Sequence, residues 1–306
     1  MWNLTNTPPA IIEAEVFTRV PDEFAVRKKS EWSEANKFGG EVASFLEGPA
    51  FDRAGDLYVT DIPFGRIFRI APDGTWTLVT QYDGWPNGIA IHKDGRLFIA
   101  DYRRGLLVLD PATGKIETLL GHRNSESFKG LNDLTFDRDG RLYFTDQGQT
   151  GLHDPSGRVY RLDTDGRINC LLSNGPSPNG LVLDAEERTL FVAMTRANQV
   201  WRSPLMDDGT LSKVGAFRTF FGASGPDGMA VDEANNLVVA HASLGCAFVV
   251  NRRGEVTHIV RSMAGSTVTN VAYQHGSEWL YMTESETGHV LRARLPVKGK
   301  TLYSHA

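Results

Sequence analysis

The 306-residue sequence is poor in cysteine, with only Cys170 and Cys246 in the whole chain. Two isolated cysteines do not make a disulfide framework, and neither has a second Cys or a His at the spacing of zinc ligands. We therefore expect buried free thiols in a reducing compartment. The first 16 residues also lack the basic and apolar regions of a signal peptide. Together these two absences predict a cytoplasmic protein.

Long apolar runs and an excess of basic residues are also missing. No run approaches the ~18–20 apolar residues needed to cross a bilayer, so no membrane partner is expected. The net charge is −5, from 32 Lys and Arg against 37 Asp and Glu, which argues against the basic face that nucleic acid requires. There is no phosphate-binding P-loop and no Gly-x-Ser-x-Gly elbow. The sequence carries no signal for an oligomeric state.

What the sequence does contain is a six-residue pattern that recurs six times. Each copy begins with a carboxylate or amide residue and continues into the apolar core of a strand. Successive copies start 40, 45, 47, 48 and 43 residues apart, a period typical of propellers and solenoids. The copies are EGPAFD (47–52), NGIAIH (87–92), NDLTFD (132–137), NGLVLD (179–184), DGMAVD (227–232) and NVAYQH (270–275).

Each copy is followed by a turn and by further strand-like segments, for example DLYVTD (56–61) and then GRIFRI (65–70). Alternating apolar positions joined by Asp-Gly turns indicate β-hairpins. Four antiparallel strands in roughly 40–50 residues describe a propeller blade. We therefore predict an all-β protein, a single six-bladed β-propeller domain over residues 1–306. The last repeat has room for only three strands, so a strand within residues 11–20 is expected to complete that blade and close the ring.

Residues 21–43 do not fit the repeat. They are mostly polar, with Phe24, Trp32 and Phe38 as the available apolar contacts. The segment is expected to form a short helix or an ordered loop over one end of the propeller. It is either a surface connection or a lid, because it leads directly to Glu47 and long loops are often functional.

The first residues of the six copies are expected to face one another at one mouth of the central channel. Two carboxylates converging there need a counter-charge, and an all-oxygen donor set favours Ca²⁺, Mg²⁺ or Mn²⁺. Glu47 and Asp227 would neutralise a divalent cation, and Asn179 and Asn132 would complete the protein part of its shell. The alternative is that all six are turn residues, for which Asn and Asp are also suited.

Further candidates lie beside the ring. Asp133 is either a general base that activates water or a solvent-facing turn carboxylate. Lys129 lies in the polar segment before Asn132 and is either a substrate contact or a surface charge. Asn87 and Asn270 complete the ring and are predicted to contact the substrate.

At these residues the sequence resembles the regucalcin/gluconolactonase (senescence marker protein-30-like) family of six-bladed propellers, most closely its drug-responsive lactonase branch. The resemblance covers about residues 45–295, nearly the whole array of repeats. The matching stretches are LEGPAFDRAGDLYVTD, IHKDGRLFIAD, NDLTFDRDGRLYFTD, PNGLVLDAEERTLFVA and GPDGMAVDEANNLVVA.

The resemblance implies a site and a reaction. Glu47, Asn179 and Asp227 would be the shared metal ligands, and Asn132 would match a position that binds metal in some members and substrate or water in others. Asp133 would match the acid/base carboxylate of the lactonase branch. The family's usual metal is Ca²⁺, with Zn²⁺, Mn²⁺, Mg²⁺ or Fe²⁺ in some members, and its usual reaction opens a sugar lactone or a similar ester ring.

These observations lead to the hypothesis of metal-dependent lactone hydrolysis. A divalent cation polarises the lactone carbonyl, and Asp133 or Asp227 takes a proton from the attacking water. Two alternatives stay open. One is hydrolysis of an organophosphate or another ester at the same metal site, and the other is a non-catalytic metal-binding scaffold, since fold alone does not give function.

Overall fold

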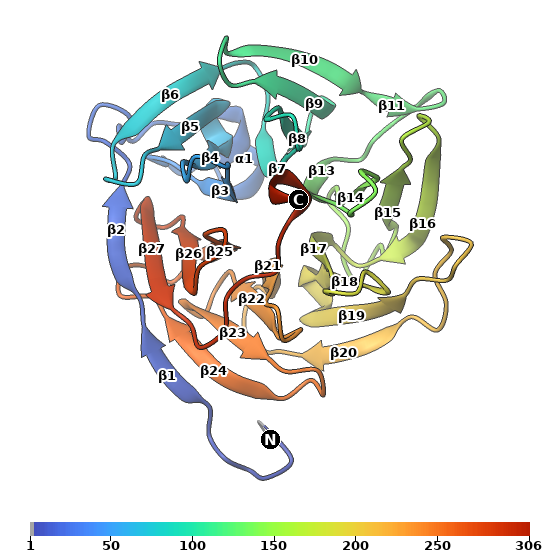
Figure 1. The fold of residues 1–306 in the computed structure, drawn as a ribbon. Coiled ribbons are helices and arrows are strands. Elements are labelled where there is room, and N and C mark those ends of the chain that lie inside the picture. The colour runs from blue at the N-terminus through green and yellow to red at the C-terminus, as the bar shows by residue number, and fades with distance from the viewer. Residues whose placement is uncertain (1–2) are drawn as a thin grey trace.

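The computed structural model describes residues 3–306, which form a small two-stranded sheet and six larger β-sheets, the blades, arranged around a central channel (Figure 1). In each of the six blades the first strand of the repeat is innermost, and each following strand lies further out (Figure 1). The prediction of a six-bladed β-propeller is therefore confirmed. Blades 1 to 3 comprise β3 (Leu46–Phe51), β4 (Leu57–Asp61), β5 (Arg66–Ile70) and β6 (Trp76–Gln81); β7 (Pro86–Ile91), β8 (Leu97–Asp101), β9 (Gly105–Asp110) and β10 (Lys115–Leu120); and β13 (Leu131–Phe136), β14 (Leu142–Asp146), β15 (Gly157–Leu162) and β16 (Ile168–Gly175).

Blades 4 to 6 continue the pattern and bring in the N-terminal strands. They comprise β17 (Pro178–Leu183), β18 (Thr189–Met194), β19 (Gln199–Pro204) and β20 (Gly215–Thr219); β21 (Pro226–Val231), β22 (Leu237–His241), β23 (Cys246–Val250) and β24 (Val256–Arg261); and β25 (Val268–Tyr273), β26 (Trp279–Glu284) and β27 (His289–Arg294). Strand β2 (Glu15–Arg19) pairs antiparallel with β27 and completes blade 6, as the sequence predicts.

The N-terminal segment also differs from the prediction of one strand within residues 11–20. It breaks at Ala14 into two strands, and β1 (Ala10–Glu13) pairs in parallel with β24. Blade 5 therefore has five strands. Because β1 and β2 join neighbouring blades, the N-terminal segment bridges blades 5 and 6. A second addition that the repeat does not predict is a small hairpin of β11 (His122–Arg123) and β12 (Glu126–Ser127) in the connection before β13.

The hydrophobic core is divided into clusters that lie between neighbouring blades. One cluster, for example, joins Ala50, Tyr58 and Ile67 of blade 1 to Ile89 and Leu97 of blade 2. Both faces of the inner strands are covered in this way, and every residue of β3 is buried. The outer strands are partly exposed, because they have no further strand beyond them. Burial between the blades is what fixes the channel-facing strands in place.

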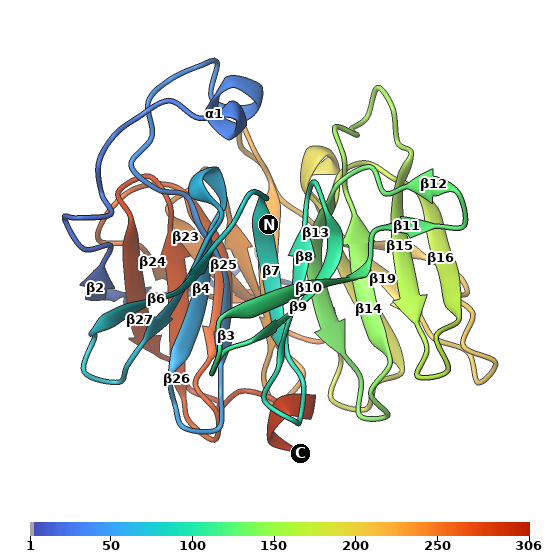
Figure 2. The ribbon, with the colours of Figure 1, turned by 90° about the horizontal axis from the view of Figure 1, so that it is seen from above.

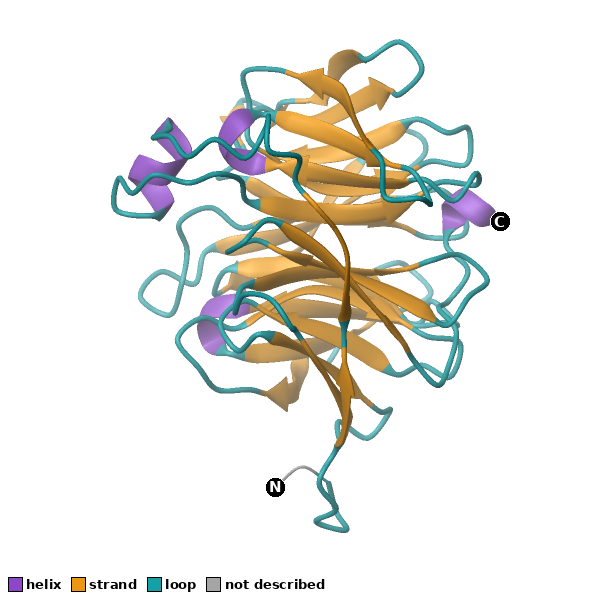
Figure 3. Cartoon of the chain, turned by 90° about the vertical axis from the view of Figure 1, so that its left-hand side faces the viewer, coloured by secondary structure: helices purple, strands orange, loops and turns teal. Residues whose placement is uncertain are grey.

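Residues 21–43 form a long loop on one face of the propeller. An isolated antiparallel β-bridge between Lys28 and Val42 joins the beginning of this loop to its end. Helix α1 (Glu31–Asn36) begins at a capping box in which Ser30 and Ser33 bond to each other's backbone. Its Trp32 packs against Phe45, with ring centroids 4.7 Å apart. The helix stands on the face opposite to the C-terminal end of the chain (Figures 2 and 3).

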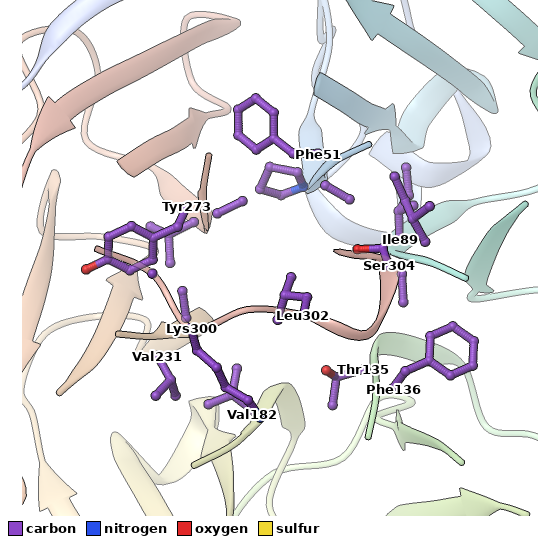
Figure 4. A pocket seen from close by; sticks show the side chains of 18 of the residues that line it. Phe51, Ile89, Thr135, Phe136, Val182, Val231, Tyr273, Lys300, Leu302 and Ser304 are labelled. Atoms are coloured by element: carbon purple, nitrogen blue, oxygen red, sulfur yellow. The ribbon is translucent and has the colours of Figure 1, made fainter. Parts of the chain in front are cut away.

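The segment after blade 6, residues 298–306, crosses the other mouth of the channel and contacts all six blades. Its short 3₁₀ helix η3 spans Tyr303–His305. The contacts involve, from blade 1 to blade 6, Arg53, His92, Phe136, Asp184, Val231 and His275. Together with the inner strands this segment encloses a cavity of about 120 Å³ (Figure 4). No helix within residues 3–306 has the length and hydrophobicity needed to span a membrane.

Candidate active site

The ring of polar residues lies where every inner strand departs from regular pairing. In each of the six inner strands the register with the second strand shifts near its start. In blade 3, for example, Asn132 and Asp133 together stand opposite Thr145 alone. Such β-bulges redirect side chains and are common next to active sites. The sequence repeat shows the polar residues but not the bulges that aim them.

Hydroxyl groups between blades hold the starts of the inner strands at fixed distances. Thr60 donates to the carbonyl of Asn87 at 2.8 Å, and Thr145 donates to that of Asn179 at 2.8 Å. Thr195 donates to Pro226 at 2.8 Å, beside Asp227. Each bond joins one blade to the next, so the ring residues are positioned by contacts between blades as well as within them.

Glu47 and Asp133 share one hydrogen-bond donor, the amide nitrogen of Asn270. Asn270 Nδ2 lies 2.9 Å from Glu47 Oε2 and 3.5 Å from Asp133 Oδ2. The oxygen Oδ1 of the Asn270 amide accepts from the backbone N–H of Val271 at 2.8 Å. Asn270 therefore presents its nitrogen, not its oxygen, to the carboxylates. The structure thus brings Asp133 into the ring as a third carboxylate beside Glu47 and Asp227.

Crowding and burial shift the pKa values of all three carboxyl groups upward. Burial raises the pKa of Glu47 to about 7, against the hydrogen bonds from Asn270 and Gly48. Burial and the charge of Glu47 raise the pKa of Asp133 to about 8. The pKa of Asp227 lies well above its ordinary value because of burial and the charges of Glu47 and Asp133. A bound cation would stabilise the ionised form of these three neighbouring carboxyl groups and would lower their pKa values again. The raised pKa values therefore fit a site that binds a cation.

Unpaired oxygens in the ring also fit a metal. Asn87 Oδ1 and Asp227 Oδ1 are buried and have no hydrogen-bond partner within the described part of the chain, which is costly unless something else binds them. No three His, Cys, Asp or Glu side chains among residues 3–306 form a metal-binding group by themselves. A metal at this ring would therefore need amide or water oxygens as well, as the predicted set with Asn179 and Asn132 supplies.

The remaining predicted residues fall into two groups. Asn87, Asn132 and Asn179 are buried in the ring. Lys129 is not brought to the ring: it is exposed, and its ammonium donates to Ser156 at 3.0 Å. Arg196, a residue that the repeat does not single out, is the cation that opposes the raised pKa of Asp227. It lies in the 3₁₀ helix η2 (Thr195–Ala197) that follows β18, so no inner-strand pattern could have pointed to it.

The fold and this ring define a six-bladed propeller with an oxygen-rich polar centre, and comparisons with known proteins narrow that class. The profile of the family described as SMP-30/Gluconolactonase/LRE-like region matches residues 45–286. This protein belongs to that family, as the sequence motifs predict.

The relatives with similar sequences include staphylococcal lactonases. Lactonase drp35 of Staphylococcus epidermidis is 34% identical over 222 residues, which cover 68% of this chain and 67% of the lactonase. Lactonase drp35 of Staphylococcus aureus strain MRSA252 is 33% identical over 235 residues, covering 73% of this chain and 70% of the lactonase.

Solved structures with lower identity share the fold. A gluconolactonase from Xanthomonas campestris matches with a TM-score of 0.74 at 24% identity, over 92% of this chain and 97% of that one. Regucalcin from Agrobacterium tumefaciens, described as a calcium-binding protein, matches with a TM-score of 0.76 at 20% identity, over 98% of this chain and 100% of that one.

Proposed function

We propose that this protein is a lactonase that requires one divalent metal ion, with its active site at the carboxylate–amide ring. The observation that carries the proposal is the convergence of Glu47, Asp133 and Asp227 in one ring, in which Asp227 Oδ1 finds no hydrogen-bond partner among residues 3–306. Membership of the gluconolactonase family and the similarity to staphylococcal lactonases support lactone hydrolysis as the reaction.

Four residues would hold the metal: Glu47, Asn132, Asn179 and Asp227. Two carboxylates balance the charge of a divalent cation, and the all-oxygen set makes Ca²⁺ the first candidate. Zn²⁺, Mn²⁺, Mg²⁺ and Fe²⁺ are the alternative ions. When bound, the metal would act as a Lewis acid that polarises the lactone carbonyl.

The protein's own groups would handle the protons. Asp133 lies beside Glu47 and Asn270 and lines the channel. As a carboxylate it accepts a proton from water as the water oxygen attacks the lactone carbonyl carbon. When the bond from that carbon to the ring oxygen breaks, Asp133 returns the proton to the ring oxygen, and a hydroxy acid results. Asp227 is the alternative base. Asn270 donates to Glu47 and Asp133 and orients both.

Residues 21–43 would serve as a lid over this site. The support is the packing of this segment beside the ring. Trp32 of α1 packs on Phe45, two residues before Glu47, and the ammonium of Lys37 lies 4.8 Å from the centroid of the Phe45 ring, near the opposite charge of Glu286. The Glu31–Arg103 ion pair, at 2.9 Å, holds α1 to blade 2.

The test combines metal analysis with rate measurements. Proton release is followed in a pH-stat on a panel of aliphatic, aromatic and sugar lactones, with esters and phosphotriesters included, before and after EDTA. We expect lactone turnover that EDTA abolishes and one divalent ion restores. Bound metal without turnover of any lactone would overturn the enzyme proposal and favour a scaffold. Turnover of phosphotriesters alone would reassign the substrate class.

Variants separate the proposed roles. Glu47→Gln and Asp227→Asn should lose both the metal and the activity. Asp133→Asn should keep the metal and lose at least about 100-fold in kcat, the usual contribution of a general base. Full activity of metal-loaded Asp133→Asn would remove that residue from the mechanism.

A further inference from the structure

A chain of side-chain hydrogen bonds leads away from Asn132 to the neighbouring blade. Asn132 Nδ2 donates to Gln147 Oε1 at 3.0 Å, and Gln147 Nε2 donates to Ser177 Oγ at 3.0 Å. Asn132 lies at the start of β13 and Ser177 directly before β17, so Gln147 bridges blades 3 and 4. None of these contacts follows from the sequence repeat, because Gln147 lies just beyond the second strand of blade 3.

Gln147 is held at its backbone as well as at its side chain. Its N–H donates to the carbonyl of Gly130 at 2.9 Å, and its carbonyl accepts from the hydroxyl of Thr150 at 2.6 Å. The same Thr150 oxygen accepts from the backbone N–H of Ser177 at 3.0 Å. Thr150 and Ser177 are both buried. The segment 147–150 is therefore tied to the starts of two inner strands at once.

Ser177 adopts a backbone conformation that few residues other than glycine adopt. Its φ is 65°, in the left-handed region, and its carbonyl accepts from Thr195 N–H at 3.0 Å. Such a conformation persists where the surrounding contacts enforce it, and it is frequent at functional sites. Here it places the Ser177 hydroxyl where Gln147 Nε2 can reach it.

The consequence for Asn132 is a defined amide orientation. Its nitrogen donates to Gln147, so its oxygen Oδ1 is directed away from Gln147. Asn270, which begins the equivalent copy in blade 6, is oriented in the opposite way, with its oxygen bound to Val271 N–H and its nitrogen directed at Glu47. The two amides thus offer the ring different chemistry: Asn132 offers an acceptor and Asn270 a donor.

We propose that Gln147 is a positioning residue that fixes the Asn132 amide with its oxygen available to the metal ion. The inference rests on the proposed metal site and adds to it the group that selects Asn132, rather than Asn270, as a ligand. Groups that orient a metal ligand in this manner typically contribute 10–100-fold to metal affinity. Without Gln147 the amide can rotate and present its nitrogen, which repels a cation.

The test measures metal affinity directly, by isothermal titration calorimetry and by the calcium-dependent rise in Tm, with kcat and KM on a lactone as further readouts. Gln147→Leu removes the acceptor for Asn132 and should weaken calcium binding by about 10–100-fold. Gln147→Glu keeps an oxygen for Asn132 Nδ2 and should bind calcium within about threefold of the natural protein or more tightly, since it adds a negative charge nearby.

A matched control lies two residues away. Gln149 is exposed and donates to the Tyr102 hydroxyl at 2.9 Å, so Gln149→Leu makes the same chemical change without touching Asn132. It should leave calcium affinity unchanged. Should Gln147→Leu fail to fold, Ser177→Ala removes the far anchor of Gln147 and is expected to weaken calcium binding by a smaller factor. Metal-free thermal unfolding separates a loss of stability from a loss of affinity.

The outcomes distinguish this inference from the function on which it rests. If the natural protein binds calcium and Gln147→Leu binds it equally well, the positioning role is wrong while the metal site stands. If Gln147→Glu weakens binding as much as Gln147→Leu, the amide orientation is not the cause and the proposal fails. If the natural protein binds neither calcium nor any other divalent ion, the proposed metal site itself is wrong, and this inference with it.

Discussion

Gly88 of blade 2 and Asp133 of blade 3 occupy complementary space across the boundary between the two blades. A β-carbon on Gly88 would collide with Asp133 Oδ1 and would lie 2.8 Å from the Asp133 α-carbon. The φ of Gly88 is not positive, so the glycine is needed for room and not for its backbone conformation. Four of the six copies carry glycine at this second position, and Asp133 extends into the space that one of them leaves.

Gly88→Ala should therefore displace Asp133 and lower kcat by at least about tenfold, while overpacking costs about 1–3 kcal/mol of unfolding free energy. Initial rates and thermal unfolding measure the two effects. Gly215→Ala is the control, since a β-carbon there would meet no atom within 4 Å and its φ is also not positive. Equal activity of Gly88→Ala and Gly215→Ala would contradict the spatial argument.

The stability that Glu47 and Asp133 contribute to the metal-free protein should be lost as the pH rises from about 4 to about 8. The pKa values of Glu47 and Asp133 are raised to about 7 and about 8 in the fold, against about 4 in the unfolded chain. Between these pH values the folded state binds more protons than the unfolded state, so raising the pH favours unfolding. The contribution of the two carboxyl groups to the free energy of unfolding is complete below about pH 4 and is lost as the pH rises through their pKa values in the folded protein. Tm measured against pH in EDTA tests this.

Calcium should reverse the sign of that dependence, because it binds the ionised carboxylates and competes with their protons. With excess calcium, Tm should rise as the pH rises over the same range. Glu47→Gln serves as the control, since it removes one of the titrating groups and should flatten the curve measured in EDTA. A Tm in EDTA that is independent of pH would show that the three carboxyl groups are not crowded in the metal-free state.

His241 should make the protein sensitive to acid. It lies fully buried at the end of β22, with Phe220 and Phe248 nearby at centroid distances of 6.0 and 6.1 Å. Burial lowers its pKa to about 4, against about 6.5 in the unfolded chain. Its contribution to stability is present above pH 6.5 and is lost as the pH falls through that value toward 4. Measured with excess calcium, where Tm is expected to fall on acidification, His241→Phe should reduce the loss of Tm between pH 7 and 4.5.

A change at an exposed histidine isolates this effect. His122 lies on the surface hairpin, and His122→Phe should leave the acid dependence of Tm as it is in the natural protein. If His241→Phe and the natural protein lose Tm in parallel on acidification, burial of His241 is not the source.

Tyr303→Ala should lower stability by about 1–3 kcal/mol, less than the ~3–5 kcal/mol of a fully buried aromatic residue because Tyr303 is half-buried. Its ring packs on His92 at 5.1 Å and on Phe136 at 5.2 Å, and thus joins blades 2 and 3. Urea unfolding monitored by fluorescence provides the measurement. Thr301→Ala, an exposed change in the same segment, should cost less than about 0.5 kcal/mol; an equal cost for both would show that the segment does not fasten the blades.

The sequence predicted the propeller and its polar ring because both depend on patterns that repeat along the chain. The copies beginning at Glu47 and Asp227 share the same order of polar and apolar residues, and the alternation in the segments that follow them predicts the strands of each blade. Asp133 was also visible, as the carboxylate that replaces glycine in its copy. The lactonase relatives agree with the family that these motifs indicated.

Other features depend on contacts between residues far apart in the chain and could not be read in this way. The break at Ala14 that sends β1 to blade 5 is an example, since both halves have the same strand-like composition. The bridge from Asn132 through Gln147 to Ser177 is another, because Gln and Ser in a connection carry no pattern. Lys129 is a case in which closeness along the chain misleads. It lies three residues before Asn132, yet its side chain is exposed and donates to Ser156.

The segment at residues 298–306 has a consequence for how the molecule opens. A propeller without such a segment can part at a single boundary between two blades while the others stay closed. Here Lys300 bonds to the carbonyl of Asp184 in blade 4 while Ser304 is bound by Arg53 of blade 1, so any boundary that widens must also release this segment. Amide hydrogen exchange in the inner strands should therefore be governed by one cooperative opening rather than by six independent ones.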